Sequence, residues 1–180
     1  TLLISIALVL IGLNIFAQWE LHNPTEISTS DRLSAVAFTD ANTGYAAGDN
    51  GTLLKTGDGG TTWISLASGT TESFYASSFP VSDTGYAAGS NGEIKKTTDA
   101  GKTWITVSAG TSAGISSIFF TSSDTGYVTL GYDGTMRKTI DGGLTWAECL
   151  VTTKVLYSVY FVDANRGYVT GTGGIIMKTM

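Results

Sequence analysis

Three aspartates that stand in the same eight-residue pattern are the first residues of this chain to suggest chemistry. Asp58, Asp99 and Asp141 each occupy the third position of Thr-x-Asp-x-Gly-x-Thr-Trp, and this octet recurs after 41 and then 42 residues. Carboxylates gathered in one place can hold a metal ion or act as a general acid and base. In this octet, however, each carboxylate is placed to accept hydrogen bonds from backbone N–H groups of its own turn. We therefore interpret the three aspartates as structural.

The other residues of the octet favour the same structural interpretation. The glycine two residues after the aspartate tolerates a positive φ, and the tryptophan begins a new strand from which its ring can cover the turn. The octet is thus predicted to be a turn that stabilises its blade, with no catalytic residue, no metal and no cofactor. The predicted structural residues are Thr56, Asp58, Gly60, Trp63, Thr97, Asp99, Gly101, Trp104, Thr139, Asp141, Gly143 and Trp146.

No enzyme site is evident outside the octets. His22 is the only histidine, which rules out a zinc site built on histidines and makes a catalytic triad improbable. A glycosidase needs two carboxylates about 5–10 Å apart across the sugar. The acidic residues outside the repeats are in no recognisable context, and the segment Asp40–Gly44 is interpreted as a turn. Arg137 and Arg166 are expected at ordinary exposed positions.

Charge and cysteine content narrow the choice of partners. The net charge is −5, and the ten lysines and arginines are scattered, so the chain lacks a basic stripe that could neutralise phosphates. Nucleic acid is therefore not an expected partner. Cys149 is the only cysteine, which excludes an intrachain disulfide. We expect it to be a buried, small apolar residue, because it continues a strand pattern.

A longer repeat surrounds the octets and predicts the fold. The pair Gly-Tyr begins at Gly44 and returns every 41 residues, at Gly85, Gly126 and Gly167. One period contains four short strand patterns separated by turn signals, and four antiparallel strands in about 40 residues are typical of one β-propeller blade. In the first period the expected strands are 33–38, 45–48, 52–56 and 62–67.

These motifs resemble a known group of proteins. The octet resembles the Asp-box, or bacterial neuraminidase repeat. The fuller unit, which joins Asp-x-x-x-Gly-Tyr-x-x-Gly to Gly-x-x-x-Lys-Thr-x-Asp-Gly-Gly-x-Thr-Trp, resembles the repeat of photosystem II stability/assembly factor-like proteins. The resemblance extends from Leu33 to Met180. It implies an all-β propeller, seven-bladed in its best-known members, of a kind that also occurs in sialidases, sortilin-type receptors and xyloglucan-active glycosidases.

The repeats divide the chain into predicted segments. Residues 33–73, 74–114 and 115–155 are three full units and residues 156–180 an incomplete fourth, so we expect a propeller fragment of about three and a half blades. Residues 1–18 read as a signal peptide, because 2–16 are apolar, uncharged and short for a membrane span. An uncleaved membrane anchor is the alternative interpretation. Residues 19–32 are expected to form a linker and a strand, Trp19–Asn23, that closes the ring.

One face of the predicted propeller is a candidate for ligand binding. The hairpins between second and third strands share this face, opposite the octets, and Tyr132 is the only aromatic residue at their tips. A hairpin that binds no ligand would account for the same residues. The candidate ligand face comprises Asp49, Asn50, Asn91, Tyr132 and Asp133.

Two functions are therefore considered for the chain. The first is an exported, non-catalytic scaffold that binds a protein or an extracellular glycan, with a secreted, periplasmic or cell-surface location and no membrane contact beyond the signal peptide. The alternative is a fragment of a secreted glycoside hydrolase, of the sialidase or xyloglucanase type, whose catalytic carboxylates lie in other blades.

Overall fold

The computed structural model describes residues 29–132 and 134–179, and these form antiparallel β-sheets. The predicted signal peptide 1–18, the strand Trp19–Asn23 and Asp133 lie outside the described residues. The first sheet comprises β1 (Leu33–Phe38), β2 (Gly44–Gly48), β3 (Leu53–Thr56) and β4 (Ile64–Leu66), and the second β5 (Phe74–Ser78), β6 (Gly85–Gly89), β7 (Glu93–Thr97) and β8 (Ile105–Ser108). The third comprises β9 (Ile115–Phe120), β10 (Gly126–Leu130), β11 (Thr135–Thr139) and β12 (Ala147–Val151), and the fourth β13 (Leu156–Phe161), β14 (Gly167–Gly171) and β15 (Ile176–Lys178).

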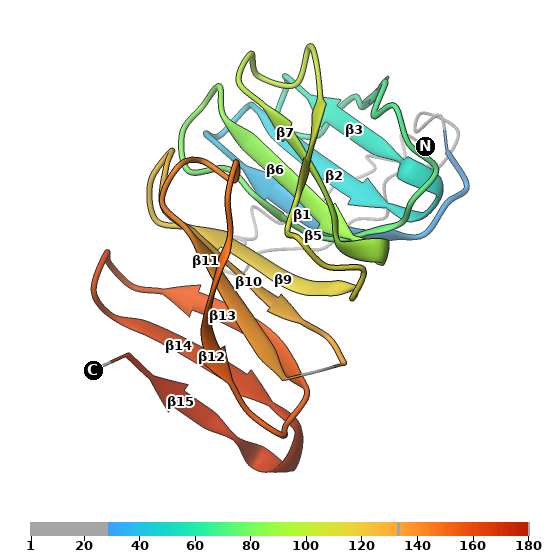
Figure 1. The fold of residues 1–180 in the computed structure, drawn as a ribbon. Helices are drawn as coiled ribbons and strands as arrows, with labels where there is room; N and C mark the ends of the chain where they lie inside the picture. The colour runs from blue at the N-terminus through green and yellow to red at the C-terminus, as the bar shows by residue number, and fades with distance from the viewer. Residues whose placement is uncertain (1–28, 133, 180) are drawn as a thin grey trace, which may run out of the picture.

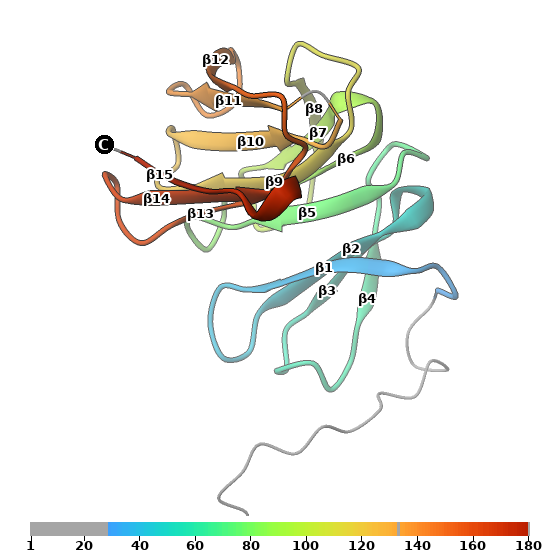
Figure 2. The same cartoon turned by 90° about the horizontal axis from the view of Figure 1, so that it is seen from below.

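The four sheets are successive blades of a β-propeller. In each sheet the strands pair in sequence order, and the first strands β1, β5, β9 and β13 lie next to one another along the arc (Figures 1 and 2). Between residues 29 and 179, leaving out residue 133, helix is confined to the three-residue 3-10 turns Asp49–Gly51, Ser90–Gly92 and Thr172–Gly174. None of the helices in the described residues is long and apolar enough to cross a membrane. The predicted all-β propeller, with three four-stranded blades and a partial fourth, is confirmed.

A close approach between a glycine and a phenylalanine ring explains the repeated Gly-Tyr pair. A Cβ atom at Gly85 would lie 2.1 Å from the ring of Phe79, which is far too close for two carbon atoms. Gly44, Gly126 and Gly167 meet the ring of the phenylalanine six residues earlier in the same way. Only glycine allows the ring to lie flat on the second strand. The phenylalanine and the Gly-Tyr pair must therefore recur together, and both do so every 41 residues.

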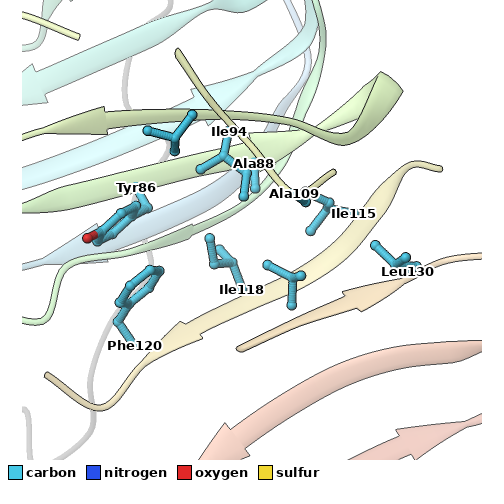
Figure 3. Packing of buried hydrophobic residues seen from close by; sticks show 10 residues of the cluster. Tyr86, Ala88, Ile94, Ala109, Ile115, Ile118, Phe120 and Leu130 are labelled. Atoms are coloured by element: carbon cyan, nitrogen blue, oxygen red, sulfur yellow. The ribbon is translucent and has the colours of Figure 1, made fainter. Parts of the chain in front are cut away.

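The tyrosine of the pair joins each blade to the next one. Tyr45 stacks on Phe79 with ring centroids 4.0 Å apart, and Tyr86 stacks on Phe120 at 3.6 Å. Figure 3 shows the rings of Tyr86 and Phe120 facing each other across the boundary between the second and third blades. Buried aliphatic residues continue this contact toward the far end of the interface, among them Ala88, Ile94, Ala109, Ile115, Ile118 and Leu130.

Two expectations about single residues are wrong. Cys149 is exposed, because the register of β11 and β12 shifts beside it and leaves it as the unpaired residue of a bulge. Neighbouring atoms still cover its thiol enough to raise the pKa, against the opposing effect of the charge on Lys138. Arg137 is not an ordinary exposed residue: its side chain is 17% exposed, donates to the carbonyls of Ala109 and Gly110, and pairs with Glu148. Arg166 is exposed, as expected.

We predict that removing the Tyr86 hydroxyl weakens the interface between the second and third blades. Tyr86 is fully buried, and its Oη lies 3.1 Å from the carbonyl oxygens of both Ser123 and Gly142. Tyr86→Phe keeps the ring but deletes the donor, so the free energy of unfolding in urea should fall by about 0.5–1.5 kcal/mol. Tyr160→Phe, at an exposed position, is the control. Equal losses in the two variants would show that the hydroxyl does not join the blades.

Candidate functional site

The octet turns use both oxygens of each aspartate. In the second turn, Asp99 Oδ1 accepts the backbone N–H of Thr103 at 2.9 Å, and Oδ2 accepts the Thr103 hydroxyl at 2.6 Å. The Thr97 hydroxyl donates to Asp99 Oδ1 and accepts the N–H of Gly101. The same bonds recur around Asp58 and Asp141. Because these donors stabilise the charged form, the pKa of each of the three carboxyls falls from 3.8 to about 2.

The glycine and tryptophan of the octet bind the turn to its surroundings. Gly101 has φ +83°, and a Cβ atom there would lie 2.9 Å from the Tyr45 ring of the preceding blade. Trp104 Nε1 donates to the Gly101 carbonyl at 3.2 Å, and its ring meets Phe79 edge-on. The glycine and tryptophan of the octet turn are therefore packed between two blades, and both oxygens of its carboxylate accept hydrogen bonds within the turn.

The structure does not bring the three octet aspartates together. They lie in separate blades, and each carboxylate is bonded within its own turn. Among residues 29–132 and 134–179, no three His, Cys, Asp or Glu side chains are placed to hold a metal ion. The geometry thus gives these twelve residues a chemistry of hydrogen bonding and packing.

The opposite face carries the predicted ligand-binding hairpins, and most of its polar side chains are used to fix the loops. Asp49 forms an ion pair with Arg32 at 3.1 Å. Asn50 donates through Nδ2 to Asp31, and Asn91 donates in the same way to Glu72, both at 2.9 Å. Each asparagine has φ 55°, a left-handed conformation that this residue tolerates better than most. These side chains anchor the hairpins to the segment that enters each blade.

Tyr132 belongs to a group of three tyrosines. This residue is 85% exposed, and it borders a hollow of about 180 Å³ together with Tyr75 and Tyr157. Gly114 separates two of the rings, since a Cβ atom there would lie 3.8 Å from Tyr132 and 3.9 Å from Tyr75. The hollow therefore gathers aromatic residues from the second, third and fourth blades. Asp133, which follows Tyr132 and was also predicted to belong to the ligand face, lies outside the described residues.

The sequence analysis missed Tyr75 and Tyr157, although the repeat contained a signal. Both residues follow the apolar residue that opens an inner strand, and they stand 82 residues apart, which is two repeat lengths. The strand registers make each of them the extra residue of a β-bulge. The extra residue of a β-bulge is left unpaired, and its side chain points in a different direction from those of a regular strand. The equivalent bulged residues in the first and third blades are the serines Ser34 and Ser116.

Several other charged side chains form ion pairs with their neighbours. Lys95 pairs with Glu93 at 3.0 Å, and Arg166 pairs with Asp163 at 2.7 Å. The three arginines belong to different blades, so the described residues contain no arginine cluster of the kind that a sialidase uses. The non-repeat carboxylates that accept a hydrogen bond or an ion pair are Asp31, Asp49, Glu72, Glu93 and Glu148.

Comparison with known proteins places this geometry in a family. A sequence profile described as photosynthesis system II assembly factor YCF48 matches residues 14–113, which is more than half of the chain. The chain belongs to the YCF48 family. This confirms the resemblance to photosystem II stability/assembly factor-like proteins. None of the curated proteins compared with the chain matches it.

Solved structures similar to this YCF48-family chain include both binding proteins and enzymes. YCF48 from Cyanidioschyzon merolae is 21% identical with a TM-score of 0.70, over 87% of this chain and 53% of that one. YCF48 bound to D1 peptide is 20% identical with a TM-score of 0.66, over 84% and 54%. The GH74 xyloglucanase from Xanthomonas campestris is 16% identical with a TM-score of 0.66, over 81% and 27%. This chain spans about half the length of the two YCF48 chains, and the likenesses establish the fold.

We predict an acid-induced loss of stability that originates in the octet turns. A carboxyl whose pKa is lower in the folded state stabilises that state above its unfolded pKa, and this contribution disappears as the pH falls toward the folded value. With pKa values of about 2 in the fold against 3.8, the loss should fall between about pH 4 and pH 2. The thermal midpoint, measured by circular dichroism across this range, should drop steeply.

Matched variants assign this loss to the octets. Asp99→Asn should lower the midpoint at pH 7 and flatten its decline below pH 4, because one of the three low-pKa carboxyls is gone. Asp124→Asn is the control, since the Asp124 carboxylate accepts no hydrogen bond from the described residues and lies in the β9–β10 turn. If both variants keep the parental decline, the octet carboxylates do not govern acid stability.

Proposed function

We propose that this chain is an exported, non-catalytic propeller module that binds an extended protein segment on its hairpin face. The observation that carries the proposal is the hollow between Tyr75, Tyr132 and Tyr157. Tyrosine offers a large flat surface with few rotatable bonds and a polar tip, and it is enriched at sites that dominate binding energy. Export is proposed from the apolar segment 2–16.

A protein segment is favoured over a glycan by the family. One structural relative is YCF48 bound to D1 peptide, so a propeller of this family accommodates a peptide. The tyrosine hollow is open and spans three blades, which suits a ligand that runs along the face rather than one enclosed in a pocket. A glycan can also stack on tyrosine rings, and the experiment below separates the two ligands.

The alternative is a module of a secreted glycoside hydrolase, which the likeness to a GH74 xyloglucanase favours. A hydrolase requires two carboxylates facing each other across the sugar. The engagement of Asp31, Asp49, Glu72, Glu93 and Glu148 by neighbouring side chains supports the non-catalytic proposal over this one. Release of reducing sugar from xyloglucan by the purified chain would decide for the hydrolase.

Binding measurements test the proposed site. The probes are the D1 peptide, a displayed library of ten-residue peptides, and xyloglucan oligosaccharides. For a peptide selected from these probes, Tyr132→Ala or Tyr157→Ala should weaken binding by about tenfold or more, because a buried aromatic contact is worth at least that factor. Tyr132→Phe should retain most of the affinity, since the ring remains. Titration calorimetry gives the dissociation constants.

A control variant distinguishes binding at the tyrosines from nonspecific binding to exposed apolar surface. Leu144 is 71% exposed and lies in an octet turn, on the opposite face. Leu144→Ala removes exposed apolar surface there and should leave peptide binding unchanged. If Leu144→Ala weakens binding as much as Tyr132→Ala does, or if only the oligosaccharides bind, the proposal of a peptide site at the tyrosines is wrong.

A further inference from the structure

The third blade departs from the repeat where its inner strand begins. In every blade, the residue before the inner strand accepts a backbone hydrogen bond from the residue after the second strand, and these equivalent acceptors are Arg32, Ser73, Gly114 and Val155. Three of the four carry a side chain, so the fold does not require glycine at this position. The φ of Gly114 also lies outside the left-handed range. The glycine of the third blade therefore needs a local explanation.

Gly114 keeps open the space between two tyrosine rings. A Cβ atom there would lie 3.8 Å from Tyr132 and 3.9 Å from Tyr75, which are ordinary van der Waals distances. A ligand atom at this point would therefore touch both rings. Tyr157 completes the hollow, and the described residues that line it include no charged side chain.

The hairpin of the third blade also lacks the anchor that fixes the hairpins of the first two blades. There an asparagine at the tip donates to a carboxylate in the loop that enters the blade, and the pairs are Asn50 with Asp31 and Asn91 with Glu72. The repeat counterpart of these two carboxylates in the third blade is Ala113. The exposed Tyr132 stands at the tip. The third hairpin thus presents an aromatic ring in place of an internal hydrogen bond.

Tyrosine rings elsewhere in this propeller lie beside cations. In three blades a lysine Nζ lies 5.4 to 5.5 Å from the centroid of a tyrosine ring, and the pairs are Lys55 with Tyr45, Lys96 with Tyr86 and Lys138 with Tyr127. A cation within about 6 Å of the centroid is attracted by the negative face of the ring. In the part of the chain that the structure describes, the rings of Tyr75, Tyr132 and Tyr157 have no lysine or arginine in such a position.

The charges at the hairpin end favour a positively charged ligand. Glu72, three residues before Tyr75, accepts a hydrogen bond from the neutral amide of Asn91 and forms no ion pair within the described ranges. Lys154, in the loop that enters the fourth blade, is the one opposing charge there that forms no ion pair with a described residue. The basic residues already neutralised by a carboxylate are Arg32, Lys95 and Arg137. With a net charge of −5 on the whole chain, the attraction of a cation prevails.

We propose that the tyrosine hollow takes the charged end of a lysine or arginine side chain from the segment that binds the hairpin face. This inference rests on the proposed function and adds the chemistry of the ligand. The aliphatic part of the side chain passes over Gly114 between Tyr75 and Tyr132, and the cation lies against the ring faces. Groups of aromatic rings bind ammonium ions in this way. The charge of Glu72 adds a longer-range attraction that salt weakens.

Choline and its uncharged isostere 3,3-dimethyl-1-butanol test the cation preference without a peptide. In NMR titrations of the 180-residue chain, choline should bind about threefold to thirtyfold more tightly than the isostere, because only choline gains the cation–π attraction. Gly114→Val should abolish this preference by filling the space between the rings, and valine already stands at the equivalent position 155. Tyr132→Leu, at an exposed tip, should reduce the preference as well and does not depend on repacking at Gly114. Leu144→Ala, at the octet end, is the control and should leave it unchanged.

A peptide selected on the hairpin face tests the same chemistry in the proposed ligand. Replacing its basic residue by norleucine keeps an aliphatic chain and removes the charge, so binding should weaken by about threefold to thirtyfold. Glu72→Gln keeps an acceptor for Asn91 and should weaken the peptide by about twofold to fivefold at low salt, and by less at high salt. Asp124→Asn removes the same charge at the octet end and should leave the affinity unchanged.

The outcomes separate this inference from the proposed function. If selected peptides bind through Tyr132 but contain no basic residue, or tolerate norleucine, the peptide site stands and the cation preference is wrong. If choline shows the expected preference and no peptide binds, the hollow is a cation site and the proposed function is wrong. Equal binding of choline and its isostere to the parent chain, or a preference that survives both Gly114→Val and Tyr132→Leu, would overturn the inference. Circular dichroism confirms that each variant is folded before its binding is measured.

Discussion

The contact on which the propeller depends is a phenylalanine ring lying between a glycine of its own blade and a tyrosine of the preceding one. Gly85 gives Phe79 room to lie flat on β6, and the exposed side of that ring then receives Tyr45. The stack brings the Tyr45 hydroxyl to the octet carbonyl of the next blade. One glycine therefore sets the distance between two sheets, and this explains why the repeat keeps Phe, Gly and Tyr in one register.

The two ends of each blade differ in how closely their residues repeat. The octet end keeps the same residue types from blade to blade, and the hairpin end varies. At the octet end the same threonine, aspartate, glycine and tryptophan recur with nearly the same hydrogen bonds. At the hairpin end, equivalent bulge positions hold Ser34, Tyr75, Ser116 and Tyr157 in successive blades. Because the octet end already stabilises the blade, side chains at the other end are free to differ, as the loops of rigid scaffolds commonly do.

The sequence was sufficient to predict what the repeat itself dictates. The four strands per unit, the separate octet turns and the exposed Tyr132 all follow from patterns within one period, where local turn chemistry and alternation govern the structure. Arg137 shows what such patterns miss. Its register position is held by Leu54 and Lys95 in the first two blades, and its burial depends on carbonyls from the loop that ends at Gly110. Contacts between blades are invisible to a pattern read within one blade.

The same limit explains Cys149 and the tyrosine hollow. Alternation along β12 predicts Cys149 inside, but one bulge reverses the facing of the residues beyond it. Likewise, Tyr75 and Tyr157 look like ordinary strand residues until the bulges of β5 and β13 are known. A bulge is decided by how two strands pair, and it leaves little trace in the composition of either strand.

The two flanks of the arc differ because the contacts between blades have a direction. Each tyrosine and lysine pair points forward to the next blade, and each octet carbonyl is presented backward. The flank of the first blade is therefore an apolar hollow of about 370 Å³, lined by residues such as Leu33, Val36 and Trp63, without a donor pair. The third blade repeats the forward direction of the first two, since Tyr127 stacks on Phe161 of the fourth blade and Lys138 lies over the Tyr127 ring. The direction of the contacts between blades is therefore a property of the repeat and does not depend on any one blade.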